Sequence, residues 1–361
     1  MQFVMTKDLK KGMRLAKPVY NKKGVLLYGR DTKLTEQGIA SIKNFDLIGI
    51  YILEPAEPLP PMTDDDIEFE RFQTMAVFSI KDDMQALLKK NTPANIGRLV
   101  DLILVNYGRG TKKISFTQGL RSQADYVYKH ALNVAILAAL ICGRMKINGS
   151  MQKEIVTSAL LYDIGKLLMP QSIACKDDPD EDEKEMIKRA ILDGYSLFDY
   201  ADIPQSTKRM ISQAQREIYK LGSNVYEGKE HIVNDETKIL MVADTYDKLT
   251  AMKIDESPMS EIAVVRYLME SGQFDRKVVN ALTSSINIVV PGVCVELMNG
   301  EKGLVIAENK QNLLKPSVLV FNTNMIYNLE DDNDSIQIRD VMKSMDNRII
   351  VDKALLKEYS K

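Results

Sequence analysis

The side chain in this sequence with the clearest chemical potential is a carboxylate at the end of an apolar run. Asp163 closes the stretch Ala159-Leu160-Leu161-Tyr162-Asp163 and is followed closely by a glycine. Ile155, Ala159 and Asp163 are spaced four residues apart, so a helix would turn Asp163 towards its buried face. An unpaired buried charge is costly, and Asp163 therefore requires a hydrogen-bond donor, a cation or a metal ion.

Two further polar residues occupy inward-facing helix positions. His130 lies in an apolar stripe of the helix predicted over 122–145. A single histidine there is more often a hydrogen-bonded core residue than a metal ligand. Asp244 shares a helix face with Leu240 and Asp247, so it also points inward. A buried acid that pairs with a neighbouring helix would explain this position without a metal site. Each residue is ambiguous alone, but together they form one imidazole and two carboxylates on three inward-facing surfaces.

The histidine count limits the chemistry further. The chain contains two histidines, His130 and His231. A mechanism that needs several imidazole ligands is therefore excluded. His231 falls in a polar stretch, and we expect it to be exposed to solvent.

Helical periodicity that positions these residues continues from 67 to 287. Helices are predicted over 67–89, 93–107, 122–145, 151–163, 183–195, 206–219, 236–252, 261–270 and 276–284. Residues 54–66 are rich in proline and acids and are predicted to be a linker. The predicted domains are thus 1–53, a small mixed α/β unit; 67–287, a helical domain; and 288–361, a small β unit with a polar tail.

The terminal units show strand and turn patterns. In the first, we predict strands over 13–20, 25–28 and 47–52, a turn at 21–24, and a helix capped by Thr35 with Ile39, Ile42 and Phe45 on its apolar face. In the last, we predict a hairpin from 293–297 and 304–306, an added strand over 318–321, and a short helix over 352–359. We predict no chemistry in the first of these units.

Composition excludes several classes of partner. The formal net charge is -2 and there is no basic tract, so no nucleic acid polymer is expected. The sequence has no unbroken apolar run long enough to span a bilayer and no signal-peptide layout, so no membrane is expected. Cys142, Cys175 and Cys294 lack metal-type spacing and fit a reducing compartment. We therefore expect a cytoplasmic protein.

Three segments resemble the successive motifs of the HD-GYP family. They are Tyr126-Val127-Tyr128-Lys129-His130-Ala131-Leu132-Asn133-Val134-Ala135, Tyr162-Asp163-Ile164-Gly165-Lys166 and Val242-Ala243-Asp244-Thr245-Tyr246-Asp247-Lys248-Leu249-Thr250. Members of this family are HD-superfamily helical bundles that hydrolyse cyclic dinucleotides, chiefly cyclic di-GMP, at a two- or three-metal site. The resemblance covers roughly 122–285. It implies a mainly α fold: an HD-superfamily bundle flanked by a small N-terminal α/β unit and a small C-terminal β hairpin unit.

The departures from the family pattern fall on its metal ligands. The substituted ligand positions carry Tyr162, Ala190, Gln215 and Arg216. The Gly-Tyr-Pro signature is replaced by Leu221-Gly222-Ser223-Asn224-Val225-Tyr226, and the arginine after the last motif is Lys253. The residues retained from the pattern are His130, Asp163, Lys166 and Asp244.

These substitutions oppose hydrolysis. Metal-assisted phosphodiester cleavage needs two cations, each held by nitrogen and carboxylate ligands, and alanine coordinates nothing. Arg216 would place a positive charge where a metal belongs, and it could pair with Asp163 or Asp244 instead. We therefore expect a degenerate, catalytically inactive HD-GYP-like protein that acts in signalling or as an interaction scaffold, with no catalytic residue and no cofactor.

Two alternatives retain a ligand at the site. The first is an active, metal-dependent cyclic di-GMP phosphodiesterase with an unusual site. His130, Asp163 and Asp244 would then hold one weakly bound divalent metal (Mn, Fe or Zn) as a remnant of the family site. The second is a receptor that binds a cyclic dinucleotide without cutting it, with Lys166 as the candidate phosphate contact.

A scaffold requires a partner. We expect a partner protein, bound through the terminal units, or a homodimer formed through 67–89.

Overall fold

The computed structural model describes residues 2–20, 25–44, 49–53, 62–118, 124–176, 178–221, 233–251, 258–309, 312–330 and 336–341. The chain forms two compact units. One contains 1–74, 260–266 and 287–361, and the other contains 75–259 and 267–286. The predicted division into four segments stays a prediction.

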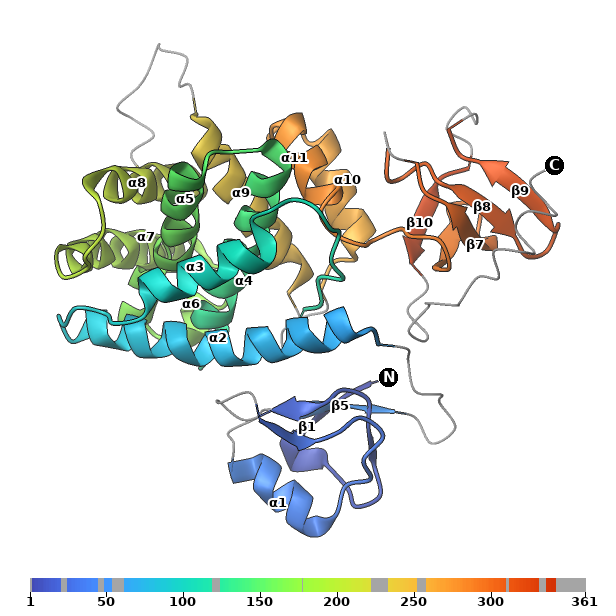
Figure 1. Ribbon diagram of the computed structural model, residues 1–361, viewed down its shortest axis with the longest axis horizontal. Coiled ribbons are helices and arrows are strands. Elements are labelled where there is room, and N and C mark those ends of the chain that lie inside the picture. The colour runs from blue at the N-terminus through green and yellow to red at the C-terminus, as the bar shows by residue number, and fades with distance from the viewer. Residues whose placement is uncertain are drawn as a thin grey trace. The chain divides into compact units, whose positions relative to one another are not determined.

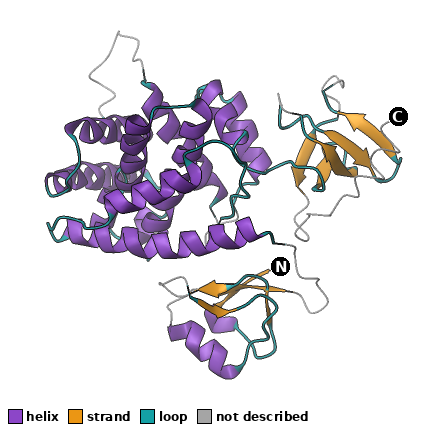
Figure 2. Ribbon diagram, in the orientation of Figure 1, coloured by secondary structure: helices purple, strands orange, loops and turns teal. Residues whose placement is uncertain are grey.

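The predicted mainly α fold class is confirmed: a helical bundle is accompanied by small N-terminal sheets and a C-terminal antiparallel sheet (Figures 1 and 2). The helices are α1 (Glu36–Asn44), α2 (Asp64–Leu88), α3 (Ile96–Tyr107), α4 (Tyr126–Met145), α5 (Gly149–Leu161), α6 (Gln171–Ala174), α7 (Glu181–Tyr195), α8 (Gln205–Tyr219), α9 (Asp235–Thr250), α10 (Glu261–Glu270) and α11 (Arg276–Thr283). Short 3-10 helices are η1 (Thr6–Asp8), η2 (Ile164–Leu168) and η3 (Ser196–Asp199). Each helix predicted from periodicity is present, with ends shifted by a few residues.

The strands form three antiparallel sheets. The N-terminal strands are β1 (Gln2–Met5), β2 (Arg14–Leu15), β3 (Val19–Tyr20), β4 (Leu26–Tyr28) and β5 (Gly49–Leu53). They pair in the orders β1-β5-β2 and β3-β4. The C-terminal strands are β6 (Cys294–Leu297), β7 (Lys302–Ala307), β8 (Ser317–Val320), β9 (Met325–Asn328) and β10 (Ile338–Val341), in the order β10-β6-β7-β8-β9.

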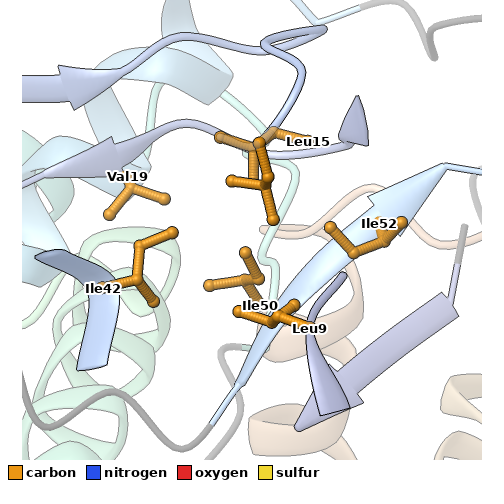
Figure 3. Close-up of a cluster of buried hydrophobic side chains, with 7 residues drawn as sticks. Leu9, Leu15, Val19, Ile42, Ile50 and Ile52 are labelled. Atoms are coloured by element: carbon orange, nitrogen blue, oxygen red, sulfur yellow. The ribbon is translucent and has the colours of Figure 1, made fainter. Parts of the chain in front are cut away.

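The N-terminal sheets and α1 enclose a small apolar core (Figure 3). Its buried members are Leu9, Leu15, Val19, Leu34, Ile42, Ile50 and Ile52. The Thr35 hydroxyl caps α1 as predicted, accepting a hydrogen bond from the Gly38 N–H at 3.0 Å. The single strand predicted over 13–20 is wrong, because the segment forms two short strands in different sheets. Pro18 lies between them and has no N–H to donate to a ladder.

The C-terminal sheet extends beyond the prediction. The hairpin β6–β7 and its pairing with β8 confirm the predicted strands. Strands β9 and β10 were not predicted, because neither MIYN nor IRDV shows a clear apolar alternation; β9 is mostly exposed, and in β10 Ile338 is buried. The turn predicted at 21–24, Phe45 and the helix predicted over 352–359 lie outside the described residues.

Helix α4 is the centre of the bundle and packs against α3, α5, α9 and α11. It carries apolar side chains on all its faces, and every residue from 130 to 142 is buried. Among the described residues it alone has the length and composition of a membrane span, and 89% of that apolar window is buried within the structure. This burial is the environment expected for a core helix.

The turn that carries Asp163 packs against α7 through two glycines. A methyl group added at Gly165 would lie 2.6 Å from the Cα of Ile191. One added at Gly194 would lie 2.5 Å from the Cα of Gly165. Backbone therefore meets backbone, and neither position has room for a side chain.

We predict that Gly194→Ala lowers the free energy of unfolding by about 1–3 kcal/mol, because the added methyl group would force η2 and α7 apart. The matched control is Gly97→Ala on α3, where nothing lies within 4 Å of the added carbon. Alanine favours the helix there by about 0.5–1 kcal/mol. Urea unfolding of both variants checks the prediction, and equal stability of the two would contradict it.

Two charged residues of α10, Arg266 and Glu261, interact with strand β10 of the C-terminal sheet. Arg266 on α10 donates a hydrogen bond from Nη2 to the backbone oxygen of Ile338 on β10, at 2.6 Å. Burial, followed by the negative charge of Asp340 on β10, raises the pKa of Glu261 from its usual 4.5 to about 7. The folded chain therefore retains a proton on Glu261 that the unfolded chain loses earlier.

This raised pKa predicts a pH dependence. Stability from protonated Glu261 is fully present below pH 4.5 and is lost as pH rises through about 7. Glu261→Gln keeps the side chain neutral, so its stability advantage over the wild type should grow between pH 5.5 and pH 8. Urea midpoints at the two pH values measure the change. A constant difference between wild type and variant would contradict the prediction.

Candidate functional site

The structure brings together the three residues that the sequence analysis selected. His130 comes from α4, Asp244 from α9, and Asp163 from the turn between α5 and η2. The His130 Nε2 atom lies 3.1 Å from Asp244 Oδ1 and 3.6 Å from Asp163 Oδ2. All three side chains are buried, as the helix-face argument predicted. The three inward-facing helix surfaces therefore converge on one polar cluster.

A fourth residue, Asp247, fixes the imidazole from the other side. Its Oδ2 lies 2.6 Å from His130 Nδ1. Its Oδ1 accepts hydrogen bonds at 2.9 Å from the side-chain amides of Asn133 and Gln118. In the sequence Asp247 shares a helix face with Asp244, but no role was predicted for it, for Asn133 or for Gln118. Asn133 follows His130 by one helical turn, and this spacing was the signal in the sequence that could have identified Asn133 as a partner of the site.

Tyr162 closes the remaining side of the histidine. Its hydroxyl lies 2.7 Å from His130 Nε2 and donates a hydrogen bond to Asp244 Oδ1, also at 2.7 Å. A hydroxyl has one proton, so with that proton on Asp244 its oxygen accepts from His130 Nε2. Burial, followed by the charges of Asp244 and Asp163, holds the pKa of Tyr162 well above its usual value. The side chain is therefore a neutral phenol that bridges the imidazole and the carboxylate.

The environment of His130 favours its protonated form. Burial is the largest influence and lowers its pKa, but hydrogen bonds and charges from Asp244 and Asp247 outweigh burial, so the pKa is raised above 6.5. The pKa of Asp244 is lowered in turn, because His130 and Lys248 together outweigh the opposing effect of burial. The pair is therefore an imidazolium between carboxylates. We assign both ring nitrogens as donors from this network.

Asp163 has a cation and a phenol as partners. The Lys166 ammonium lies 2.9 Å from Asp163 Oδ2, an atom that accepts no well-aligned hydrogen bond from the described residues. The Tyr219 hydroxyl, at the end of α8, donates to Asp163 Oδ1. The Lys166 ammonium also lies over the Tyr219 ring, 5.3 Å from its centroid. Ion pairing therefore compensates this buried carboxylate within the chain.

The other substituted positions do not supply ligands. Gln215 donates from Nε2 to the backbone oxygen of Tyr162 at 2.7 Å, so it supports the turn. Ala190 is buried on α7 against Gly165. Arg216 is exposed on α8, and its predicted pairing with Asp163 or Asp244 stays a prediction. Lys166 and Tyr219 occupy the place beside Asp163, and Tyr219 was missed because its helix face could not be assigned to this site from sequence.

As they lie, these side chains do not fit a divalent cation. Within the described ranges, no group of three or more His, Cys, Asp or Glu side chains is arranged to hold a metal ion. A protonated imidazole has no lone pair to donate, and the Lys166 ammonium repels a second cation at Asp163. His231 and Lys253 fall outside the part of the chain that the structure describes. A metal bound by His130, Asp163 and Asp244 stays a prediction for metal analysis.

Comparisons with known proteins find similar sequences and one similar structure. Residues 115–278 match a protein-family model described as HD domain. The chain is 24% identical over 234 residues to the cyclic di-GMP phosphodiesterase PA4108 of Pseudomonas aeruginosa, covering 63% of this chain and 56% of that protein. It is 23% identical over 192 residues to the cyclic di-GMP phosphodiesterase PdeB of Borreliella burgdorferi, covering 52% and 50%. The chain thus spans about half the length of the curated relatives it matches.

A solved structure is also similar. Bd1817, an HDG"Y"P protein from Bdellovibrio bacteriovorus, aligns with 78% of this chain and 97% of its own, at 12% identity and a TM-score of 0.44. Residues 115–278 thus resemble an HD domain, and part of the chain is distantly similar to proteins named as cyclic di-GMP phosphodiesterases.

We predict that Tyr162→Phe lowers the free energy of unfolding by about 1–3 kcal/mol, because it removes the hydroxyl partner of two buried groups while preserving the ring. Tyr200→Phe, at a tyrosine that is 40% exposed, is the control and should change stability by less than about 0.5 kcal/mol. Chemical denaturation of both variants at one pH measures the difference. A Tyr162→Phe protein as stable as wild type would show that the bridge contributes nothing.

Proposed function

We propose that this HD-domain chain does not hydrolyse cyclic dinucleotides and acts in signalling or as an interaction scaffold in the cytoplasm. The observation that supports this proposal is the Tyr162 hydroxyl, which lies 2.7 Å from both His130 Nε2 and Asp244 Oδ1. That hydroxyl engages the nitrogen and the oxygen that a metal would need. The polar cluster then holds the bundle together in place of a metal.

The charge balance supports the same proposal. Three carboxylates, Asp163, Asp244 and Asp247, lie beside the His130 imidazole and the Lys166 ammonium, and the Lys248 ammonium also acts on Asp244 and Asp163. Hydrolysis would need cations to clamp the attacking and leaving oxygens of the phosphodiester. Here side-chain cations already neutralise the carboxylates, so no charge remains to attract those metals strongly.

A non-hydrolysing receptor for cyclic dinucleotides is the second candidate. Lys248 is partly buried, and burial followed by repulsion from Lys166 lowers the pKa of Lys248. Two ammonium groups close enough to repel each other would be stabilised by a phosphate. Lys166 remains the phosphate contact proposed from the sequence.

The test is turnover of cyclic di-GMP by the full chain in Mn²⁺ or Fe²⁺, with the P. aeruginosa relative as a positive control. We expect no linear dinucleotide, and elemental analysis of protein purified without chelator should find no stoichiometric transition metal. Turnover that is abolished by Asp163→Ala would overturn the proposal.

Calorimetry distinguishes an interaction scaffold from a receptor that binds cyclic dinucleotides. Titration of cyclic di-GMP into wild type and into Lys166→Met tests the phosphate contact without adding metal. Heat of binding that is lost in the variant supports a receptor. No heat at high micromolar ligand removes the receptor and leaves the scaffold.

A further inference from the structure

Helix α2 has two faces with different roles. Its buried face contains Phe69, Ala76, Ile80, Met84 and Leu87. These residues recur at intervals of three, four or seven, so they form one stripe along the helix. On the helical wheel, Ile67, Met75 and Phe78 lie on the opposite side of the helix.

The outward face of α2 is partly apolar. Ile67, Met75 and Phe78 are 36%, 42% and 39% exposed, and they lie within one arc of the helix opposite the buried stripe. Single exposed apolar residues are ordinary. Three on one face of a 25-residue helix form a row that another helix can cover.

Exposed charges follow the same face. They are Asp64 and Arg71 before the apolar pair Met75 and Phe78, and Asp82 and Lys89 after it. Lys89 is the first residue beyond the helix and still bonds through its N–H to the Gln85 oxygen. Along this face the charges therefore run acid, base, acid, base. Residues equally far from the middle of the face carry opposite charges.

This order is complementary to itself in an antiparallel pair. A two-fold axis between Ala76 and Val77 pairs each residue with the one equally far on the other side. Met75 then lies opposite Phe78 of the second copy, and Ile67 opposite Ala86. The same axis places Arg71 opposite Asp82 and Asp64 opposite Lys89, so both charged pairs join opposite signs.

We propose that the outward face of α2 is a homodimer interface in which two copies of this chain pair their α2 helices antiparallel. Each two-fold contact repeats, so the interface contains two copies of every pair, including Arg71–Asp82. A parallel pairing would set like charges opposite one another at each of these positions. The self-complementary charges therefore favour a second copy of this chain, in the antiparallel orientation, as the occupant.

Sedimentation equilibrium of the full chain tests the interface. We expect a concentration-dependent dimer, and Phe78→Glu should weaken its association at least about tenfold by burying a charge opposite Met75. Leu102→Glu on α3 is the control, because Leu102 is similarly exposed at 44% but lies outside this face. A wild-type monomer at every concentration up to about 100 µM would overturn the proposal.

A charge swap tests the register. Arg71→Glu places two acids opposite each other and should weaken the dimer. The double variant Arg71→Glu, Asp82→Arg restores opposite signs and should recover the wild-type association. Failure of the double variant to recover, with an unchanged circular dichroism spectrum, would show that these residues do not face each other.

Cross-linking tests the orientation. In a Cys175→Ser background, Cys142 and Cys294 are buried. Mixing the Asp64→Cys and Lys89→Cys proteins under oxidation should yield a disulfide between the two variants. Disulfides formed instead within each variant alone, 64 to 64 or 89 to 89, would indicate a parallel pair and overturn the antiparallel arrangement.

Discussion

The helical unit depends on compensating the buried negative charge at its centre. Asp163, Asp244 and Asp247 are each less than a tenth exposed, and an isolated buried carboxylate is strongly destabilising. His130, hydrogen-bonded to Asp244 and Asp247, and Lys166, beside Asp163, supply the opposite charge from within the chain. Each charged group is satisfied only while α4, α5, α9 and η2 remain packed, so the network links these elements into one cooperative structure.

The chain and its relatives are similar over part of their lengths. The curated relatives carry the name of an enzyme for cyclic di-GMP, and they share 23–24% of residues with this chain over part of their length. That degree of identity preserves a helical framework more readily than a ligand set. In this chain, the Tyr162 phenol at the end of α5 gives the Asp244 carboxylate a neutral hydrogen-bond donor. A framework of this kind can keep its shape while its chemistry changes.

Helical periodicity identifies both the core helix α4 and the partly exposed helix α2, but the two patterns differ. In α4, apolar residues on every side indicate a fully buried helix, and the polar residues His130 and Asn133 stand out because they need partners. In α2, one stripe is buried and the opposite face mixes apolar residues with alternating charge. Both patterns can be read from the sequence. Which face of α2 is buried within the chain is known only from the exposure of its side chains in the structure.

The sequence alone determined the helices and the inward direction of His130, Asp163 and Asp244. These follow from residue type and a period of 3.6, which are local properties. The substitution of family metal ligands at Tyr162, Ala190, Gln215 and Arg216 depends on the resemblance and stays a prediction. The sequence could not predict the partners of those residues. The Tyr162 hydroxyl meets His130 across 32 positions of chain and Asp244 across 82.

Only the tertiary structure decided which side chain of α8 reaches the site. Tyr219 contacts Asp163, whereas Arg216, three residues earlier, is exposed. Periodicity states which residues share a face, but the rotation and axial offset of one helix against another decide what that face meets. Those two quantities are set by close packing over the whole bundle, including the backbone contact of Gly165 with Gly194, which no short segment contains.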